Sequence, residues 1–180
     1  MSLAGKRIFV TGGSRGIGLA IALRAAADGA SVAIAAKTSD PNPKLPGTIH
    51  SAAEEIRAAG GTALPIQCDL RDENQIADAV AQAAKEFGGI DILINNAGLM
   101  RRGDITQATD EDFELSMKIN VEAPFRLIRA VIPLMTKAGG GSIVNVSSCW
   151  GINPGPNHLV YCTTKAALAA MTRCLGRDHA

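Results

Sequence analysis

The sequence Thr-Gly-Gly-Ser-Arg-Gly-Ile-Gly, at Thr11–Gly18, is the strongest guide to how this chain folds. The apolar run Ile8–Val10 comes directly before it and suits a buried strand. After it, apolar residues recur at helical spacing up to the next strong breaker, Gly29. The glycines are therefore predicted to form a turn from a strand into a helix.

Such a turn is suited to bind phosphate. Gly12 permits a tight turn, Gly16 lets the backbone approach a diphosphate, and Gly18 lets the helix pack close to the strand. The start of the helix adds free N–H groups and a partial positive charge. Glycines also cluster in ordinary turns, so the remainder of the chain has to decide between these interpretations.

Length and composition limit the class of protein. The 180 residues fit one domain, 1–180, and the apolar fraction of 47% is enough for a core. A net charge of +1 gives no reason to expect a nucleic acid or a membrane surface as partner. No run approaches the roughly 20 apolar residues that span a bilayer. The first residues lack the apolar stretch of a secretory signal, so a cytoplasmic location is expected.

The cysteines show neither a disulfide pattern nor a metal-site pattern. No two of the four cysteines form a Cys-x-x-Cys pair, and no pair of histidines lies at metal-site spacing from them. The cysteines are Cys68, Cys149, Cys162 and Cys174. Free thiols in a reducing compartment are expected, and no metal site is expected.

Strand and helix signals alternate along the chain. Strands are expected at 7–10, 31–36, 62–68, 91–95 and 142–146, the third of them beginning late because of Pro65. Helices are expected at 17–28, 48–56, 72–87 and 109–135 and from His158 to the end, with a capping box at 72–75. This alternation predicts an α/β fold, a Rossmann-like doubly wound parallel sheet of order 3-2-1-4-5. The cofactor is expected at the switch point between the first and fourth strands.

Three polar side chains suit proton-transfer chemistry. Tyr161 and Lys165 are four residues apart on an expected helix and therefore share a face. An ammonium beside a phenol favours the phenolate, and such a tyrosine is a usable general acid/base. Ser148, at the end of the expected fifth strand, can hydrogen-bond a substrate oxygen. Taken alone, the tyrosine and lysine fit an ordinary surface pair better than an active site.

Together the motifs resemble the short-chain dehydrogenase/reductase family. The glycine turn has the family's Thr-Gly-x-x-x-Gly-x-Gly spacing, and Asn95–Gly98 is similar to its Asn-Asn-Ala-Gly signature. Asn120 matches a catalytic position, and Ser148 precedes Tyr161-x-x-x-Lys165 by the family's interval. The motifs stand in the family's order across nearly the whole chain.

The resemblance implies hydride transfer between a nicotinamide and an alcohol or carbonyl carbon. Tyr161 is then the general acid/base, Ser148 holds the substrate oxygen, Lys165 tunes Tyr161 and binds the nicotinamide ribose, and Asn120 holds a water that relays protons. Asn95 braces strands in the family. The residues expected to bind the cofactor are Gly12, Ser14, Arg15, Gly16, Ile17, Gly18, Lys37, Asp69, Leu70, Asn96, Ala97, Gly98, Tyr161 and Lys165.

Pro124 gives independent information about Asn120. Proline has no N–H, so the carbonyl of Asn120, four residues earlier, loses its helical partner. That carbonyl is either free to accept from a relay water, or the helix is simply kinked.

The end of the second strand bears on cofactor choice. NAD enzymes usually place an acidic residue there to bind the ribose hydroxyls. Here Ala35 and Ala36 are followed by Lys37, and Arg15 of the glycine turn can face the same site. Two cations without a carboxylate favour the 2′-phosphate of NADP(H) over NAD(H), unless both are solvated surface charges.

The substrate side is less well defined. The segment 36–56 resembles an insertion in the hydroxysteroid-dehydrogenase-like and terpenoid-alcohol branches, which implies an apolar alcohol or carbonyl substrate. Trp150 is expected to pack or to form a pocket wall, and His158 is expected at the surface.

The chain ends at Ala180, whereas family members continue with two more strands, a segment beside the nicotinamide and a lid. A nucleotide-binding fragment without catalysis is therefore the alternative function. Family members usually pair through the helices after the fourth and fifth strands, so a homodimer or homotetramer is expected.

Overall fold

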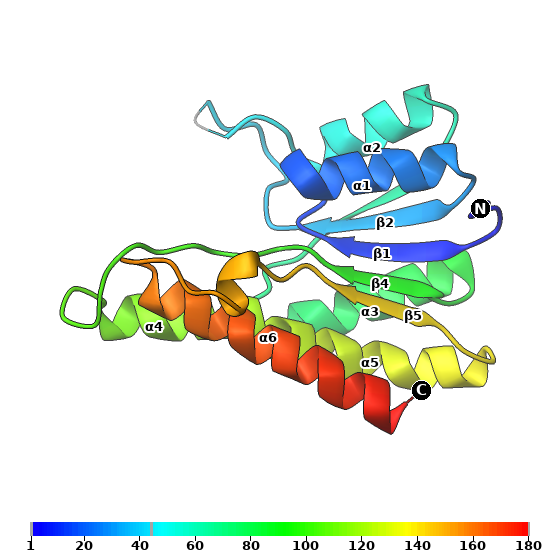
Figure 1. Cartoon of the computed structure of the whole chain (residues 1–180). Helices are drawn as coiled ribbons and strands as arrows, with labels where there is room; N and C mark the ends of the chain where they lie inside the picture. Colours follow the sequence, from blue (N-terminus) through cyan, green and yellow to red (C-terminus); the bar gives the residue numbers. More distant parts are fainter. Residues whose placement is uncertain (1, 44, 180) are drawn as a thin grey trace.

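A parallel five-stranded sheet forms the centre of the computed structural model, which describes residues 2–43 and 45–179. The strands are β1 Arg7–Thr11, β2 Ser31–Ala36, β3 Thr62–Gln67, β4 Ile92–Asn95 and β5 Ser142–Asn145. Their order is β3-β2-β1-β4-β5 (Figure 1), so the predicted sheet order is confirmed.

Helices cover both faces of this sheet. They are α1 Gly16–Ala27, α2 Ile49–Ala58, α3 Glu73–Phe87, α4 Asp110–Met117, α5 Ala123–Lys137 and α6 Leu159–Asp178, with a π-helical turn η1 Lys118–Glu122 and a 3-10 turn η2 Cys149–Gly151. In Figure 1, α1 and α2 lie on one side of the sheet and α3 to α6 on the other.

Each strand supplies side chains to two cores because successive residues of a strand point to opposite faces. Ile8 and Val10 of β1 pack in the core beneath α1 and α2. Phe9, between them, is fully buried in the core beneath α3 and α5. Burial of each such side chain contributes about 1.5–3 kcal/mol, so these alternating runs fix the register of the sheet.

Pro65 does not delay the third strand, contrary to the expectation from sequence. β3 begins at Thr62, and Pro65 stands opposite Ile34 in the β2–β3 register. β3 is an edge strand of the described sheet, where a residue without an N–H is tolerated.

The helix expected over 109–135 is interrupted. α4 and α5 are separated by the π-helical turn η1, in which the Ala123 N–H donates to the Lys118 carbonyl, five residues earlier. Pro124 follows directly and supplies no N–H of its own. The one-residue slip in the hydrogen-bond ladder therefore lies where the proline leaves room for it, and it places Asn120 in the turn.

The expected capping box at 72–75 is also only half present. The Asp72 side chain accepts from the N–H groups of Asn74 and Gln75, as a helix N-cap does. The Asp72 N–H, however, donates to the Asp69 carbonyl, and the Gln75 Oε1 accepts from the Asp69 N–H at 2.9 Å. The reciprocal capping box occurs instead at α2, between Thr48 and Ser51.

The face of β4 and β5 beside α1 is less covered than the rest of the sheet. Ile92 and Ile94 of β4 line a groove of about 490 Å³ together with Ile17 and Ile21 of α1. Val144 of β5 is 46% exposed. Within the described residues β5 is an edge strand, as expected from sequence.

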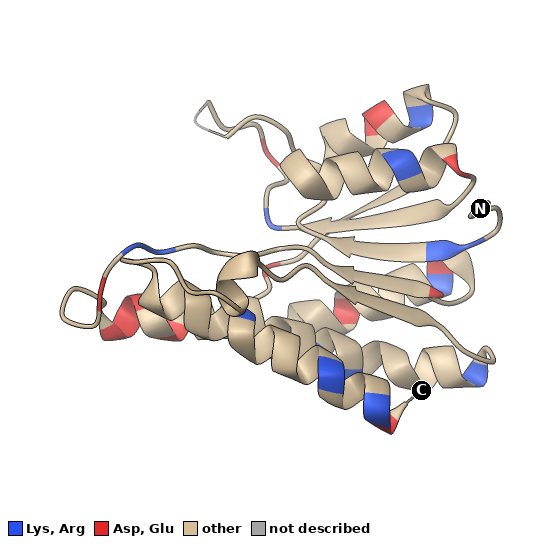
Figure 2. Cartoon of the chain, viewed as in Figure 1, with Lys and Arg blue, Asp and Glu red and all other residues tan. Residues whose placement is uncertain are grey.

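Charges are mixed over the fold. Figure 2 shows Lys and Arg interspersed with Asp and Glu on the helices and loops, as a net charge of +1 leads one to expect. Across the part of the chain that is described, every helix is too short or too polar to cross a bilayer.

Candidate active site and dinucleotide cleft

The glycine turn joins β1 to α1 in a backbone conformation that suits glycine. Gly12 and Gly16 have φ angles of +65° and +56°, in the left-handed region. A Cβ at Gly18 would overlap the Gly12 carbonyl oxygen and lie 2.5 Å from the Asn96 side-chain nitrogen. The helix therefore starts against the end of the strand, as the spacing predicts.

The start of α1 is open for an anion. Its N-cap residue, Arg15, makes no side-chain capping bond, so the first N–H groups of the helix are not used by it. Gly16 and Ile17 are exposed, and Ile17 is 67% exposed, whereas Ser14 is buried. This arrangement fits the diphosphate of a dinucleotide.

Thr11 and Asn96 lock the switch point between β1 and β4. The Thr11 Oγ1 accepts from the N–H groups of Asn96 (3.0 Å) and Ala97 (3.1 Å). In return, the Asn96 Nδ2 donates to the carbonyls of Thr11 (3.0 Å) and Gly12 (3.3 Å). These bonds fix the glycine turn relative to the Asn-Asn-Ala-Gly segment.

Asn95 lies on the sheet rather than in the cleft. Its Nδ2 donates to the Oδ1 of Asn145 at 2.8 Å, which connects β4 to β5. The Asn145 Nδ2 continues this chain to Thr172 of α6 at 3.0 Å. The bracing position implied by the resemblance is therefore present.

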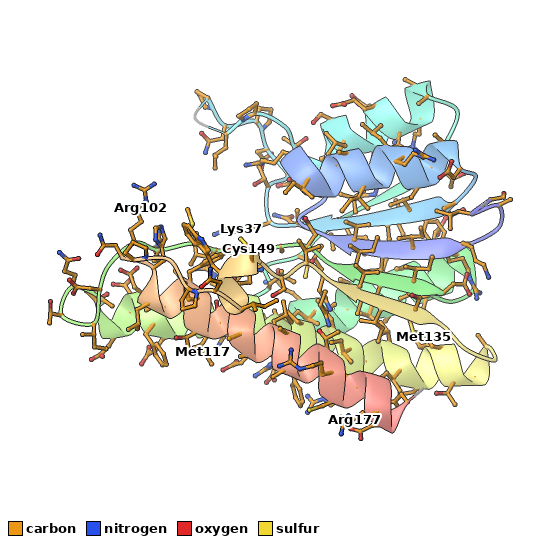
Figure 3. The ribbon with its side chains drawn as sticks, viewed as in Figure 1. Lys37, Arg102, Met117, Met135, Cys149 and Arg177 are labelled. Atoms are coloured by element: carbon orange, nitrogen blue, oxygen red, sulfur yellow. The ribbon has the colours of Figure 1, made fainter. Side chains whose placement is uncertain are left out.

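A cavity of about 290 Å³ extends from the glycine turn across the ends of β2 and β3. Its lining contains five of the residues expected to bind the cofactor, namely Gly12, Lys37, Asp69, Leu70 and Ala97. Figure 3 shows Lys37 at the carboxyl-terminal edge of the sheet, where ligands of doubly wound folds bind.

Arg15 is tied to the loop after β2. Its Nη2 donates to the Gly47 carbonyl at 2.7 Å. Its Nε is buried without a hydrogen-bond partner. Thus one part of the guanidinium holds Gly47 against the glycine turn, while a second donor remains unused.

The surroundings of Lys37 differ from the sequence-based expectation of cations without a carboxylate. The Lys37 Nζ lies 3.8 Å from the Asp69 Oδ2, and Asp69 is in turn held by Arg71. The Arg71 hydrogen bonds lower the pKa of Asp69 to about 2. Sequence alone did not reveal this contact, because Asp69 reaches Lys37 only through the pairing of β2 with β3.

Asn120 links three segments of the site. Its Oδ1 accepts from the Leu99 N–H and its Nδ2 donates to the Leu99 carbonyl, both at 2.8 Å. The Nδ2 also donates to the Thr164 Oγ1 at 2.9 Å. Asn120 therefore holds the loop after β4 and the start of α6 in a fixed relation. Thr164 was not identified from sequence, although its place just before Lys165 was a usable signal.

Lys165 is buried at the centre of this arrangement. Only 4% of it is exposed, and its Nζ donates to the Val146 carbonyl at 2.8 Å. A Cβ at Gly98 would lie 3.4 Å from that Nζ and 3.5 Å from the Asn120 Oδ1. Burial lowers the pKa of Lys165 from its usual value. The structure thus brings Gly98, Asn120 and Lys165 together.

Tyr161 lies one helical turn before Lys165, and the Lys165 Nζ is 5.8 Å from the centre of its ring. Ser148 caps the turn η2, and its Oγ accepts from the Trp150 N–H at 3.2 Å. The Trp150 ring meets the Tyr161 ring edge-on at 6.2 Å. Tyr161, Lys165 and the segment from Ser148 therefore border one region of the fold.

His158 is not a surface residue, contrary to the sequence-based expectation. It is 9% exposed, and its ring lies 4.3 Å from the Trp150 ring. Its Nδ1 lies 2.7 Å from the Pro156 carbonyl oxygen. The tryptophan buries it, and this contact arises only when η2 folds back on α6.

A largely apolar groove of about 740 Å³ opens on the other side of Trp150. Ile105, Ile152 and Leu159 are among the residues that line it, whereas Ser148, Tyr161 and Lys165 are not. The groove therefore adjoins the candidate catalytic side chains without containing them.

The four cysteines are free thiols. Burial and two neighbouring carboxylates raise the pKa of Cys68 to about 11, so this thiol is unreactive near neutral pH. In Figure 3, Cys149 is labelled at η2, and it is exposed. Among the described residues, no cluster of His, Cys, Asp and Glu could hold a metal ion.

Comparisons with known proteins agree with this geometry. The profile of the short chain dehydrogenase family matches residues 6–180. Hydroxysteroid dehydrogenase-like protein 2 from Danio rerio is 50% identical over 169 residues, which cover 93% of this chain and 41% of that protein. The protein of the same name from Homo sapiens is 49% identical over 152 residues, which cover 84% and 36%. This chain spans about two-fifths of the length of these relatives.

Solved structures have the same fold. A short-chain type dehydrogenase/reductase from Mycobacterium marinum has a TM-score of 0.89 at 36% identity, covering 98% of this chain and 70% of that chain. A short chain dehydrogenase from Mycobacterium thermoresistibile has a TM-score of 0.87 at 40% identity, covering 98% and 64%. The family profile matches residues 6–180, and the structural neighbours share the fold, so this chain belongs to the short-chain dehydrogenase family.

Proposed function

We propose that residues 1–180 form a single dinucleotide-binding and catalytic domain of an NADP(H)-dependent oxidoreductase that interconverts an alcohol and a carbonyl. The principal support is the position of Lys165, which is buried, hydrogen-bonded to the Val146 carbonyl and 5.8 Å from the Tyr161 ring. A buried ammonium beside a phenol is an arrangement for proton transfer rather than for a surface ion pair.

The residues present fit a nicotinamide dinucleotide. The glycine turn and the start of α1 offer N–H groups to its diphosphate, and Gly18, where a Cβ would overlap the Gly12 carbonyl oxygen, lets the helix start close to the end of β1. Ala97 and Leu70 supply apolar walls on the adenosine side. When bound, the cofactor would supply the hydride in reduction and accept it in oxidation, and the protein would have only to position the partners and move a proton.

Tyr161 is the proposed general acid/base. In reduction its hydroxyl donates a proton to the carbonyl oxygen, and in oxidation the phenolate accepts one from the alcohol. Ser148 hydrogen-bonds the same substrate oxygen. Lys165 favours the phenolate, and its donors beyond the one used by Val146 are proposed to reach the ribose. The Asn120 carbonyl, in the π-helical turn, is proposed to hold a relay water.

NADP is the proposed cofactor because two cations, Lys37 and Arg71, line the cavity beside the single carboxylate of Asp69, and Arg15 lies in the adjoining glycine turn. Lys37 is 66% exposed and free to move toward a phosphate, and the Nε of Arg15 is a buried donor without a partner. The strand β2 ends in Ala36, which leaves no acid at the position that binds ribose hydroxyls in NAD enzymes.

The proposed substrate is a small, mainly apolar alcohol or carbonyl compound. The relatives in the comparison are called hydroxysteroid dehydrogenase-like, and Trp150, whose ring lies 6.2 Å from the Tyr161 ring, would give the substrate an apolar wall. We also propose a homodimer or homotetramer formed through α5 and its surroundings. Phe113 of α4 and Phe125 of α5 are 45% and 50% exposed, which supports an interface there. Light scattering at micromolar concentration tests this, and a monomer would contradict it.

The decisive test combines binding and turnover. NADPH fluorescence titration should show saturable binding, and a panel of carbonyl substrates should show NADPH oxidation with at least one apolar member. Binding without turnover on any substrate would favour the second candidate, a nucleotide-binding fragment. That candidate is supported by the partly uncovered β4–β5 face and by the share of its relatives that the chain spans.

A further inference from the structure

The carboxylate of Asp69 is held by both of its oxygens. The Arg71 Nε lies 2.9 Å from Oδ1 and 3.0 Å from Oδ2, and the Arg71 Nη2 lies 2.5 Å from Oδ2. The Arg71 N–H adds a bond to Oδ1 at 3.1 Å. One arginine therefore fixes both the orientation and the charge of this carboxylate.

Asp69 stands where it would oppose a 2′-phosphate. It lines the same 290 Å³ cavity as Lys37, and its Oδ2 is 3.8 Å from the Lys37 Nζ. Any phosphate that Lys37 binds would approach this carboxylate. Two anions at such a separation repel strongly unless a cation lies between or beside them.

Arg71 supplies that cation. It also lines the cavity, and its side chain is 47% exposed while that of Asp69 is only 20% exposed. The guanidinium is thus the more exposed member of the pair. Asp69 is ionised at neutral pH, as a free aspartate is, and the Arg71 hydrogen bonds lower its pKa further, to about 2.

We propose that Arg71 is a specificity-determining residue, which neutralises Asp69 and so permits a 2′-phosphate to bind beside Lys37. This inference rests on the proposed NADP-dependent function and adds a residue to it. On binding, Lys37 exchanges Asp69 for the phosphate, while Arg71 keeps the carboxylate paired. Without Arg71, Lys37 would have to neutralise both the Asp69 carboxylate and the 2′-phosphate.

The test compares NADP⁺ with NAD⁺ in the purified chain by calorimetric titration. Arg71→Gln should weaken NADP⁺ binding roughly tenfold, because the 2′-phosphate would then meet the unneutralised carboxylate of Asp69, and change NAD⁺ binding less than about twofold. Arg71→Lys, which keeps the charge, should restore most of the NADP⁺ affinity. Raising the salt concentration should shrink the effect of Arg71→Gln on NADP⁺ binding.

Arg24→Gln is the matched control, since Arg24 pairs with Asp28 at the far end of α1. It should change neither constant.

A second background separates neutralisation from direct contact. In Asp69→Asn, which removes the repelling charge, Arg71→Gln should lose most of its effect on the ratio of the two dissociation constants. An undiminished effect there would overturn the proposal, because Arg71 would then bind the phosphate itself. Equal losses for both cofactors would also overturn it, since they would mark a merely structural role. If the unmodified chain prefers NAD⁺ or binds neither, it is the proposed NADP-dependent function that fails.

Discussion

The Nδ2 of Asn120 lies 2.9 Å from the Oγ1 of Thr164, and this bond joins the π-helical turn to α6, the helix that carries Tyr161 and Lys165. Both residues are buried, and the Thr164 hydroxyl donates in turn to the Tyr161 carbonyl at 2.8 Å. The position of Tyr161 therefore depends on a polar bridge beneath it.

Thr164→Val should destabilise the fold, because it leaves the buried Asn120 amide with an unmet donor. We expect a loss of about 1–3 kcal/mol in the free energy of unfolding, measured by urea denaturation. Thr163→Val is the control, since Thr163 is exposed and its hydroxyl bonds only to the Leu159 carbonyl of its own helix. Equal losses in the two variants would refute the bridge.

Gly18→Ala should damage both folding and dinucleotide binding, because its Cβ would overlap the Gly12 carbonyl. Overpacking of this kind costs about 1–3 kcal/mol. Gly176→Ala adds the same methyl group to α6, where nothing lies within 4 Å, and should change stability by less than about 1 kcal/mol. Thermal unfolding and NADPH titration measure the two effects. If Gly18→Ala bound NADPH as tightly as the unmodified chain, the glycine turn could not be the diphosphate site.

Asp91 should make stability depend on acid pH. Its carboxylate accepts from Arg7 at 2.6 and 2.8 Å, and these hydrogen bonds lower its pKa from the usual value. A depressed folded-state pKa means that the stabilisation is present above the unfolded value, about 3.9, and is lost as the pH falls through the folded value. Unfolding free energies measured from pH 6 downward should therefore decline less steeply in Asp91→Asn. Asp78→Asn, at an exposed position of α3, should keep the steep decline.

Ala36→Asp should reverse the cofactor preference from NADP⁺ to NAD⁺. A carboxylate at the end of β2 would face the 2′-phosphate beside Lys37 and offer an acceptor to the ribose hydroxyls of NAD. We expect NADP⁺ to bind at least about tenfold more weakly, since placing like charges together costs several kcal/mol, and NAD⁺ to bind more tightly. Equal dissociation constants for the two cofactors in the unmodified chain would refute the NADP assignment.

The sequence predicted the sheet order and the switch-point cleft because both follow from short-range patterns. Apolar runs mark the strands, and the glycine spacing marks the turn between β1 and α1. Pro124 indicated a disturbed helix, but not that the disturbance would be a π-helical turn around Asn120. Nor did it indicate that Asn120 would bond to Leu99 and Thr164, which are distant in sequence.

The contacts that sequence missed are tertiary. From its sequence position, His158 is expected to be an exposed polar residue near the start of a helix. In the structure, Trp150 covers it because η2 folds back on α6. Asp69 and Lys37 are separated by more than thirty residues, and only the pairing of β2 with β3 brings them within 3.8 Å. Neither periodicity nor motif spacing contains that information.

The most direct test of the proposed chemistry is the turnover of Tyr161→Phe with NADPH and a carbonyl substrate that the unmodified protein reduces. The ring and its packing against Trp150 are retained, and only the transferable proton is removed. We predict a loss of turnover on the order of 10²–10⁴-fold with NADPH affinity nearly unchanged, whereas Lys165→Ala should lose both. If Tyr161→Phe kept more than about a tenth of normal turnover, Tyr161 could not be the general acid.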